Sequence, residues 1–322
     1  MSEIRKRLKK LDELEGKVDS VLVINRERDP NFFYLTGLDI TGAFYYDFSE
    51  TVILTSEMEA GRARKSGAKN VVVVKKFGEF LGKGRTRKIG IDAKGISLSA
   101  YRRLKIRGID ISAYLSKMRA VKSRGEIKNI KEACKIAARI MEKAVGEISP
   151  KITEWELKSV IECGMLKKGV EPSFPTIVET AENISPHHAP GNRKLKEPVL
   201  IDLGVRYNGY CSDITRTVGS SFENIIEKVF AEVEEELKPG AAAADIDKKA
   251  RQVMGKYSRH FLHSLGHGIG IEVHENPSLS KASNDVMKAG MTFTIEPGIY
   301  IKGGMRHEED YILTERGAVK LT

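Results

Sequence analysis

The segment SLGHGIGIEVHEN, residues 264–276, contains two histidines, His267 and His274, that are seven residues apart. A helix is disfavoured because glycines at positions 266, 268 and 270 surround the first histidine, and each costs about 1 kcal/mol within a helix. We therefore interpret GIGIEV as strand. Along a straight strand an odd separation places two side chains on opposite faces. Either the chain bends between the two histidines, or they have different roles.

Other histidines are concentrated in the same way. His263 precedes His267 by four residues, and the motif SPHHAPG places His187 and His188 in a loop flanked by prolines. Loops held on a rigid scaffold often carry binding and catalytic residues. Because five of the seven histidines fall within two short motifs, we expect several of them to do chemistry rather than packing.

Two aspartates lie on the clearest hairpin of the chain, VLIDLGVRYNGYCSDITRTV. Its Asn-Gly pair at 208–209 favours a type I′ turn, in which both central residues have positive φ. If Tyr207 pairs with Tyr210, Asp202 and Asp213 share one face as diagonal neighbours, with backbones about 7–8 Å apart. Buried carboxylates need compensation, which a metal ion would provide. The alternatives are that both face solvent, or that Asp213 pairs with Arg216.

Two further carboxylates come from FTIEPGIYIKGGMRHEEDYILT. Glu296 ends a β-type run, and its partner across the following turn is either Glu308 or Glu309. A two-residue turn at the glycine pair favours Glu309, whereas a three-residue turn favours Glu308. Strand parity alone leaves this choice open. The alternative for Glu309 and Asp310 is an exposed acidic pair on the rim.

Two domains are expected to position these side chains. Residues 1–122 alternate the β-branched runs SVLVIN, TVILT, NVVVVKK and KIGID with helical segments such as SEMEAGRARKSG. In that helical segment Ser56 and Glu59 have capping-box spacing. The alternation predicts a small α/β domain. It contains no glycine-rich phosphate loop and no catalytic cluster.

Residues 123–322 are predicted to form an α+β domain. Ser123 with Glu126, and Thr153 with Glu156, are capping boxes that begin two helices. Apolar or small residues follow the first box at three-four spacing, which indicates one buried helix face. These are Ile127, Ile130, Cys134, Ala137, Met141, Ala144 and Val145. After residue 195 the pattern changes to strands and glycine-rich turns, which predicts an antiparallel sheet.

Composition limits the class of protein. The 322 residues carry a net charge of +10 and 30% charged residues. No apolar run approaches the roughly 20 residues of a membrane helix, and the first twenty residues lack a signal-peptide pattern. Three cysteines without metal-type spacing do not suggest a disulfide framework. We expect a cytoplasmic protein, and no nucleic-acid partner, because no DNA- or RNA-binding motif accompanies the basic charge.

The motifs together resemble the pita-bread-fold metallopeptidases, which include proline dipeptidase, aminopeptidase P, methionine aminopeptidase and the metal-free creatinase. The first domain contains NFFYLTGL, which is similar to the amino-terminal domain of the proline-specific branch. The second contains six family motifs in the family's order: SFPTIV, SPHHAPG, LIDLGVRYNGYCSDITRT, HSLGHGIGIEVHE, IEPGIYI and RHEEDYILTERG. The resemblance implies a ribonuclease-H-like, creatinase-type N-terminal domain followed by a pita-bread catalytic domain.

The resemblance also implies a two-metal site. Its ligands would be Asp202, Asp213, His267, Glu296 and Glu308, with Asp213 and Glu308 bridging both ions. Glu308 is favoured over Glu309 because the family pattern reads Arg-x-Glu. Four carboxylates and one imidazole suit manganese or cobalt, with zinc or iron as alternatives. In this family the two ions hold a bridging hydroxide that attacks the peptide carbonyl.

Further roles follow from the same resemblance. Glu296 would carry the proton towards the leaving amine, while His187, His263 and His274 would contact the substrate. Arg306 would hold the metal-site carboxylates and border the substrate. The implied activity is cleavage of the Xaa-Pro bond in dipeptides by a homodimer. The alternatives are an aminopeptidase P acting on longer peptides, a creatinase-like amidine hydrolase, and a non-catalytic binding protein on the same fold.

Overall fold

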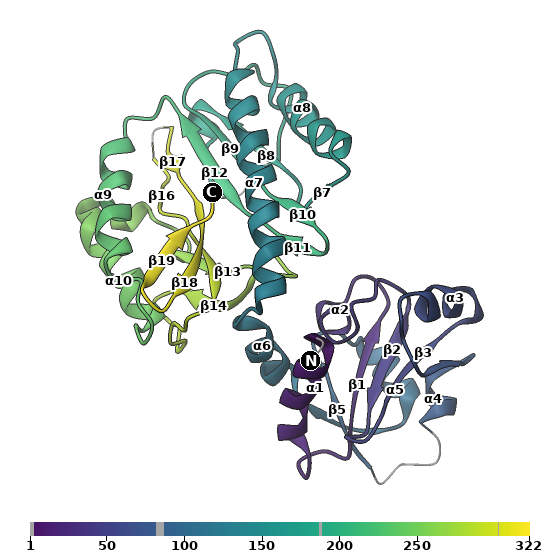
Figure 1. The fold of residues 1–322 in the computed structure, drawn as a ribbon. Helices are drawn as coiled ribbons and strands as arrows, with labels where there is room; N and C mark the ends of the chain where they lie inside the picture. The colour runs from purple at the N-terminus through teal and green to yellow at the C-terminus, as the bar shows by residue number, and fades with distance from the viewer. Residues whose placement is uncertain (1–2, 82–86, 187–188, 302) are drawn as a thin grey trace. The chain divides into compact units, whose positions relative to one another are not determined.

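The computed structural model describes residues 3–81, 87–186, 189–301 and 303–322, with only the backbone at position 182. The chain divides into two compact units, Met1–Arg119 and Ala120–Thr322 (Figure 1). This division lies three residues before the boundary expected from the sequence. Each unit has its own sheets and its own core, so each is described by itself.

The N-terminal unit is built on one six-stranded sheet with the order β4-β3-β2-β1-β5-β6. β1 pairs parallel with β5 and antiparallel with β2, and β3 pairs parallel with β4. The four β-branched runs all form strands here. The strands are β1 (Ser20–Asn25), β2 (Gly42–Tyr46), β3 (Thr51–Thr55), β4 (Val71–Val73), β5 (Lys88–Ile91) and β6 (Arg107–Asp110).

Three helices of this unit begin after a short polar residue. Asp29 caps α2 by accepting a hydrogen bond from Phe32 N, and the helix ends at Gly37 with a φ of 70°. Ser56 occupies the N-cap of α3, but its side chain makes no capping hydrogen bond. The capping box predicted at Ser56 and Glu59 is therefore wrong, although the helix is present. The helices are α1 (Glu3–Leu11), α2 (Pro30–Thr36), α3 (Glu57–Lys65), α4 (Phe77–Phe80), α5 (Leu98–Leu104) and α6 (Ser112–Ala120), and the 3-10 turn η1 is Asp12–Leu14.

The first half of the C-terminal unit packs two helices against a three-stranded sheet. Both predicted capping boxes are formed, at Ser123 with Glu126 and at Thr153 with Glu156. Apolar side chains of α7 and α8 make one core with the sheet β12-β9-β8. The elements are α7 (Arg124–Gly146), α8 (Glu154–Lys167), β7 (Glu171–Pro172), β8 (Ile177–Thr180), η2 (Ala181–Asn183), β9 (Val199–Leu203), β10 (Val205–Tyr207), β11 (Tyr210–Cys211) and β12 (Ile214–Val218).

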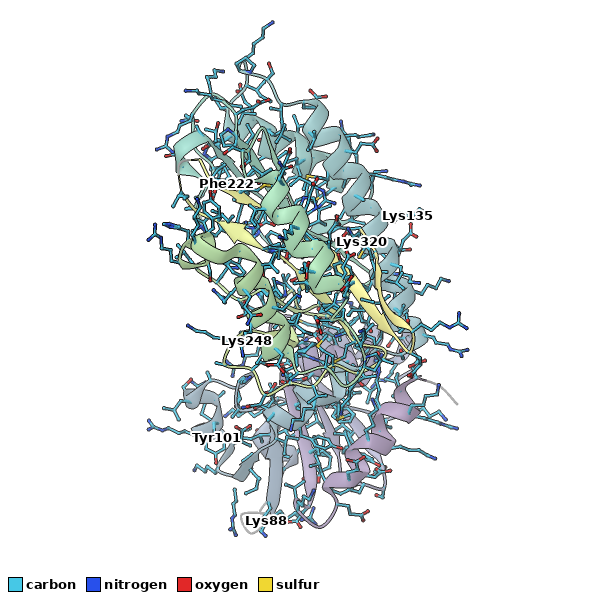
Figure 2. All side chains as sticks on the ribbon, turned by 90° about the vertical axis from the view of Figure 1, so that its left-hand side faces the viewer. Lys88, Tyr101, Lys135, Phe222, Lys248 and Lys320 are labelled. Atoms are coloured by element: carbon cyan, nitrogen blue, oxygen red, sulfur yellow. The ribbon has the colours of Figure 1, made fainter. Side chains whose placement is uncertain are left out.

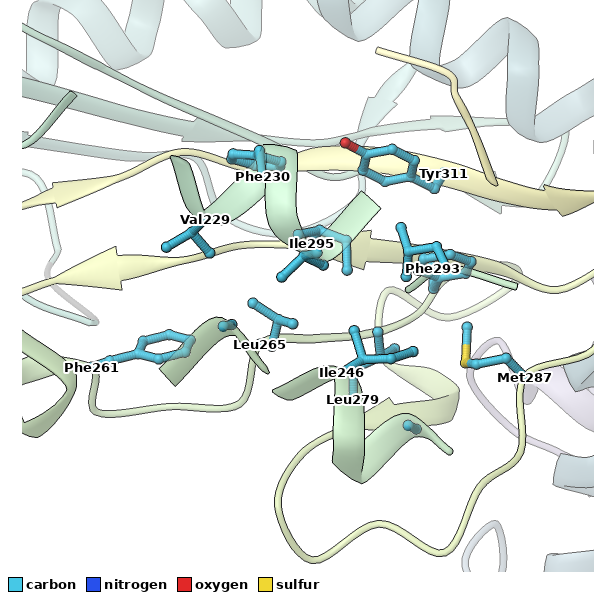
Figure 3. Close-up of a cluster of buried hydrophobic side chains, with 14 of the residues drawn as sticks. Val229, Phe230, Ile246, Phe261, Leu265, Leu279, Met287, Phe293, Ile295 and Tyr311 are labelled. Carbon is cyan, nitrogen blue, oxygen red and sulfur yellow. The ribbon is translucent and has the colours of Figure 1, made fainter. Parts of the chain in front are cut away.

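The second half repeats this plan with two helices on the five-stranded sheet β14-β13-β15-β18-β19. Figure 3 shows its core, where Phe230 and Ile246 of the helices face Phe293 and Ile295 of the sheet. The elements are α9 (Glu223–Glu234), α10 (Ala243–Met254), η3 (Gly255–His260), β13 (Gly266–Gly268), β14 (Glu275–Leu279), β15 (Thr292–Ile295), β16 (Gly298–Ile299), β17 (Met305–Arg306), β18 (Glu309–Thr314) and β19 (Gly317–Lys320).

Two sequence interpretations need correction. Strands and turns were expected throughout the region after residue 195, but α9 and α10 lie within it. Their signal was the three-four spacing of buried residues, such as Ile226, Val229 and Val233 in α9. The segment GIGIEV is also not a strand, because β13 ends at Gly268 and residues 269–274 form a bend.

The two halves of the C-terminal unit meet at a backbone bridge between Thr215 and Glu308. Charged side chains such as Lys135 and Lys248 project outward from this unit (Figure 2). Among the described residues, the helices are all too short or too polar to cross a bilayer. The bridge between Thr215 and Glu308 joins the two halves of this unit beside the candidate carboxylates.

Candidate metal and catalytic site

Asp202 and Asp213 take the hairpin register expected from the sequence. Tyr207 pairs with Tyr210, and Asp202 lies opposite Thr215. Asn208 and Gly209 have φ values of 49° and 83°, which the type I′ turn requires. The two carboxylates are 7% and 5% exposed. The alternative in which both face solvent is therefore excluded.

Glu296 and Glu308 come from a second hairpin, and its register decides between the two candidate glutamates. Ile295 pairs with Glu309, and Ile299 pairs with Met305. Continuous pairing places Glu308 opposite Glu296, with the turn between Ile299 and Met305. The turn is thus longer than either the two- or the three-residue turn considered from the sequence. Because this turn contains an odd number of residues, as the three-residue turn does, it places Glu308 and not Glu309 on the same face as Glu296.

Glu309 points away from Glu296 and is neutralised by other groups. Its carboxylate accepts hydrogen bonds from Arg216 at 2.9 Å and Thr322 at 2.8 Å, and lies 3.1 Å from His307 Nε2. Burial raises the pKa of Glu309, but these partners outweigh it and lower the pKa to about 2. The alternative in which Asp213 pairs with Arg216 is therefore excluded, because Arg216 pairs with Glu309.

Asp310 is fully buried, so the alternative of an exposed acidic pair at 309–310 is also excluded. Its Oδ2 accepts hydrogen bonds from Asp213 N at 3.0 Å and from Cys134 Sγ at 3.2 Å. Burial raises the pKa of Asp310 to about 7. Asp310 thus supports the backbone of Asp213 from behind the cluster.

His267 and His274 are brought together by the bend that replaces the expected strand. Their ring centroids are 4.2 Å apart, with an angle of 63° between the planes. The pairing of β13 with β14 shifts register after His267. Burial first, and then His274, lower the pKa of His267 to about 3. His267 is therefore a neutral imidazole with a lone pair available for a cation.

Several ligand-type atoms converge around His267. Its Nε2 lies 3.6 Å from Asp213 Oδ2 and 3.6 Å from Glu296 Oε1. One ligand atom each from Asp213, His267 and Glu308 lie within 4.8 Å of one another. Burial, followed by repulsion from neighbouring carboxylates, raises the pKa values of Asp213 and Glu308 well above their usual range. Burial raises the pKa of Glu296 to about 8.

This cluster fits a divalent cation. Asp202 Oδ1, Asp213 Oδ1 and Glu308 Oε1 are buried oxygens without a hydrogen-bond partner among the described residues. Leaving such atoms uncompensated costs several kcal/mol, on the order of the penalty for an unpaired buried charge. Carboxylate oxygens with one imidazole nitrogen are the ligands that hard and borderline divalent ions prefer. A cation at this position would satisfy all three oxygens.

Arg306 supports the cluster from one side. Its guanidinium donates to Asp202 Oδ2 at 2.6 Å, to Thr215 Oγ1 at 3.2 Å and to Tyr300 Oη at 2.9 Å. Tyr300 Oη in turn lies 2.6 Å from His263 Nε2. Arg306 is 3% exposed. Its main contacts are therefore internal, and they hold Asp202 and Tyr300 in place.

All described candidates line one cavity of about 680 Å³. These are Asp202, Asp213, His263, His267, His274, Glu296, Arg306 and Glu308. Trp155, Lys158 and Phe174 form another part of its wall, and Trp155 is 46% exposed. His187, predicted as a substrate contact, lies outside the described residues.

Three supporting residues were not recognised in the sequence. Thr215 donates a 2.7 Å hydrogen bond to Glu308 Oε2, and Asp310 and Tyr300 make the contacts given above. Thr215 lies two residues after Asp213, so strand alternation could have placed it on the same face. Nothing in the sequence pattern singles out Tyr300, because its position depends on the second hairpin.

The chain is similar to known proteins over nearly its whole length. Residues 128–315 match metallopeptidase family M24, and residues 4–121 match the creatinase/prolidase N-terminal domain. The chain is 34% identical to the Xaa-Pro dipeptidase of Pyrococcus furiosus, over 99% of this chain and 98% of that one. The prolidase structure from Pyrococcus horikoshii OT3 superimposes with a TM-score of 0.91 and 31% identity, covering 99% and 97% of the two chains.

A third similarity is to X-Pro aminopeptidase from Thermotoga maritima, with a TM-score of 0.88 and 30% identity over 98% and 97% of the two chains. The chain belongs to metallopeptidase family M24. Its C-terminal unit has the pita-bread fold, and its N-terminal unit is the creatinase-type α/β domain. It is therefore a metal-dependent hydrolase.

Proposed function

We propose that this chain is a Xaa-Pro dipeptidase, which hydrolyses the bond between an N-terminal residue and proline. The observation that supports this most directly is the buried cluster of carboxylates and one imidazole in the wall of a 680 Å³ cavity. A cavity of this size suits a dipeptide better than a folded protein. Full-length similarity to the P. furiosus Xaa-Pro dipeptidase supports the same substrate.

In this proposal Asp202, Asp213, His267, Glu296 and Glu308 hold two divalent cations. Asp213 and Glu308 would serve both ions, Asp202 would serve one, and His267 with Glu296 would serve the other. The unpartnered oxygens of Asp202, Asp213 and Glu308 support this assignment. Arg306 keeps Asp202 oriented through its 2.6 Å hydrogen bond.

When bound, divalent cations supply Lewis-acid polarisation of the scissile carbonyl and lower the pKa of water. Glu296 carries a proton from the attacking water towards the leaving nitrogen of proline. His274, beside His267 on the cavity wall, donates a hydrogen bond to the carbonyl oxygen as negative charge develops. His187 and His263 complete the contacts to the substrate.

The preferred ions are manganese or cobalt, with zinc or iron as alternatives, because four carboxylates outnumber the single nitrogen ligand. We expect two ions per chain in metal analysis of the wild type. Asp213→Asn should bind substantially less metal. If neither the wild type nor Asp213→Asn binds metal, the site assignment fails.

The substrate assignment is tested with purified, metal-loaded enzyme on Met-Pro, Leu-Pro and the tripeptide Leu-Pro-Gly. Release of free leucine from Leu-Pro, with little from the tripeptide, is the expected result. Cleavage of the tripeptide alone would identify an aminopeptidase P, for which the T. maritima similarity is the supporting observation. No turnover of any peptide by protein that retains its metal would favour a non-catalytic binding protein.

We further propose that the enzyme is a cytoplasmic homodimer. The net charge is +10, but no DNA- or RNA-binding motif accompanies it, and we therefore propose a small peptide rather than DNA or RNA as the substrate. Light scattering coupled to size-exclusion chromatography tests the oligomeric state. A monomer of unchanged activity would contradict the dimer without affecting the proposed chemistry.

A further inference from the structure

The net positive charge of the chain comes from the N-terminal unit. Residues 1–119 contain 25 lysines and arginines against 15 aspartates and glutamates, whereas residues 120–322 contain 29 of each. The whole net charge of +10 therefore belongs to the N-terminal unit. A charge imbalance of this kind raises the affinity of a surface for anions.

Part of this charge converges on a second cavity, of about 910 Å³, within the N-terminal unit. Its lining contains five cationic side chains, namely Arg26, Lys75, Lys76, Arg103 and Lys105, and a single carboxylate, Glu79. Where the structure is described, none of these five cations forms an ion pair. Like charges that share a cavity repel one another, so an anion bound among them would be stabilised.

The cavity lies at the place where open α/β sheets bind ligands. β1, β3 and β4 run in the same direction, and the residues just beyond their carboxyl ends, Arg26, Ser56 and Val74, all line it. From β1 the sheet continues to β5 and β6 on one side, and from β3 it continues to β4 on the other. The order of the strands reverses at β1, because the next strand in the chain, β2, lies on one side of β1, whereas β5 and β6 lie on its other side (Figure 1). Such a reversal opens a crevice at the carboxyl ends of the strands.

The rest of the cavity lining suits an aromatic ring, in addition to the anion that the cations would bind. Val74, Phe77 and Leu104 are half-buried side chains that pack against the core of the unit and present apolar surface to the cavity. Thr41 and Ser56 add two hydroxyl groups. The Ser56 hydroxyl is not used to cap α3. Small-molecule pockets of about 300–1,000 Å³ combine an apolar wall with a few polar groups in this way.

We propose that this cavity binds an organic phosphate of nucleotide size, with the phosphates among the five cations and the ring against Phe77. A single cavity that gathers cations over an apolar wall fits one nucleotide better than a polymer, because a polymer needs an extended basic track. The site is separate from the peptidase chemistry and does not depend on it.

The test is isothermal titration of the full-length protein with ATP, inorganic pyrophosphate and adenosine at physiological ionic strength. The informative variant is Lys75→Glu combined with Lys76→Glu. Its matched control is Lys9→Glu combined with Lys10→Glu, which makes the same charge change at exposed positions of α1 outside the cavity. Because all three proteins keep the metal site, any binding of ATP there is common to them. Melting temperature and peptidase activity confirm that the variants are folded.

The wild type should bind ATP and, more weakly, pyrophosphate, whereas adenosine alone should bind little. The cavity variant should bind ATP at least tenfold more weakly, and the α1 control should bind within a factor of two of the wild type. Equal weakening in both charge variants would show non-specific attraction and overturn the proposal. Affinity for an anionic lipid vesicle or a single-stranded oligonucleotide above that for ATP would overturn it as well.

Discussion

The imidazole rings of His267 and His274 lie 4.2 Å apart, although the two residues are seven positions apart and only the first belongs to a strand. The bend at residues 269–274 brings both rings to the wall of one cavity. His267 faces Asp213 and Glu296, while His274 lies against His267 on the same wall. The two histidines are therefore neighbours without being equivalent.

Substitution of the two histidines should separate metal binding from catalysis. His274→Ala should keep its full metal content and lose activity by a factor of about 10²–10³, the usual effect of removing one donor to a developing oxyanion. His267→Ala should lose metal affinity at least ~10-fold, because a ligand is missing. Metal analysis alongside initial rates checks this. Equal metal loss in both variants would contradict the separate roles.

Arg306→Met should destabilise the metal-free protein. The change leaves Asp202 buried without its cationic partner, which typically costs about 3–5 kcal/mol. A bound cation would compensate Asp202 in its place, so the difference in melting temperature from the wild type should shrink when manganese is added. Arg306→Lys should recover part of the stability. A difference that is the same with and without metal would argue that Arg306 acts through packing alone.

Gly268→Ala should disrupt the bend that joins the two histidines. A Cβ atom at position 268 would lie 2.2 Å from the backbone oxygen of Asn276, so the chain has to move. Overpacking of this kind costs roughly 1–3 kcal/mol or more. The matched control is Gly164→Ala in α8, where a Cβ atom would meet nothing within 4 Å. This control substitution should stabilise the protein by about 1 kcal/mol, because alanine favours a helix more than glycine does. Chemical denaturation measures both changes, and an unaltered stability and activity for Gly268→Ala would refute the prediction.

Asp29 should make the stability of the N-terminal unit depend on pH. Burial, with a smaller contribution from Asp92, raises the pKa of Asp29 to about 6 from its ordinary value of 3.8. The protonated form is thus favoured in the folded state. The stability it contributes is present below pH 3.8 and is lost as the pH rises through about 6.

Asp29→Asn keeps a side chain that can cap α2 and removes this ionisation. The variant should gain stability relative to the wild type between pH 4.5 and pH 7, by roughly 1–3 kcal/mol for a buried group with a shift of this size. Urea denaturation of both proteins at the two pH values isolates the difference. A constant difference across the pH range would contradict the assignment.

Much of the site could be predicted where the signal is local. The Asn-Gly turn set the pairing of Tyr207 with Tyr210, and alternation along the strands then placed Asp202 and Asp213 on one face. The capping boxes at Ser123 and Thr153 likewise depend on contacts three residues apart. One local prediction failed, because Ser56 makes no capping hydrogen bond although Ser56 and Glu59 have capping-box spacing. The partner of Arg216, which the sequence left open, is Glu309.

The sequence by itself determined the ligand types, their order along the chain and the hairpin that holds the two aspartates, because turn chemistry and strand alternation act over a few residues. The tertiary structure decided three matters that depend on contacts between distant segments. It placed Glu308 rather than Glu309 opposite Glu296, buried Asp310 behind Asp213, and folded His274 back against His267. Each depends on a turn length or a bend that only packing against other strands can set.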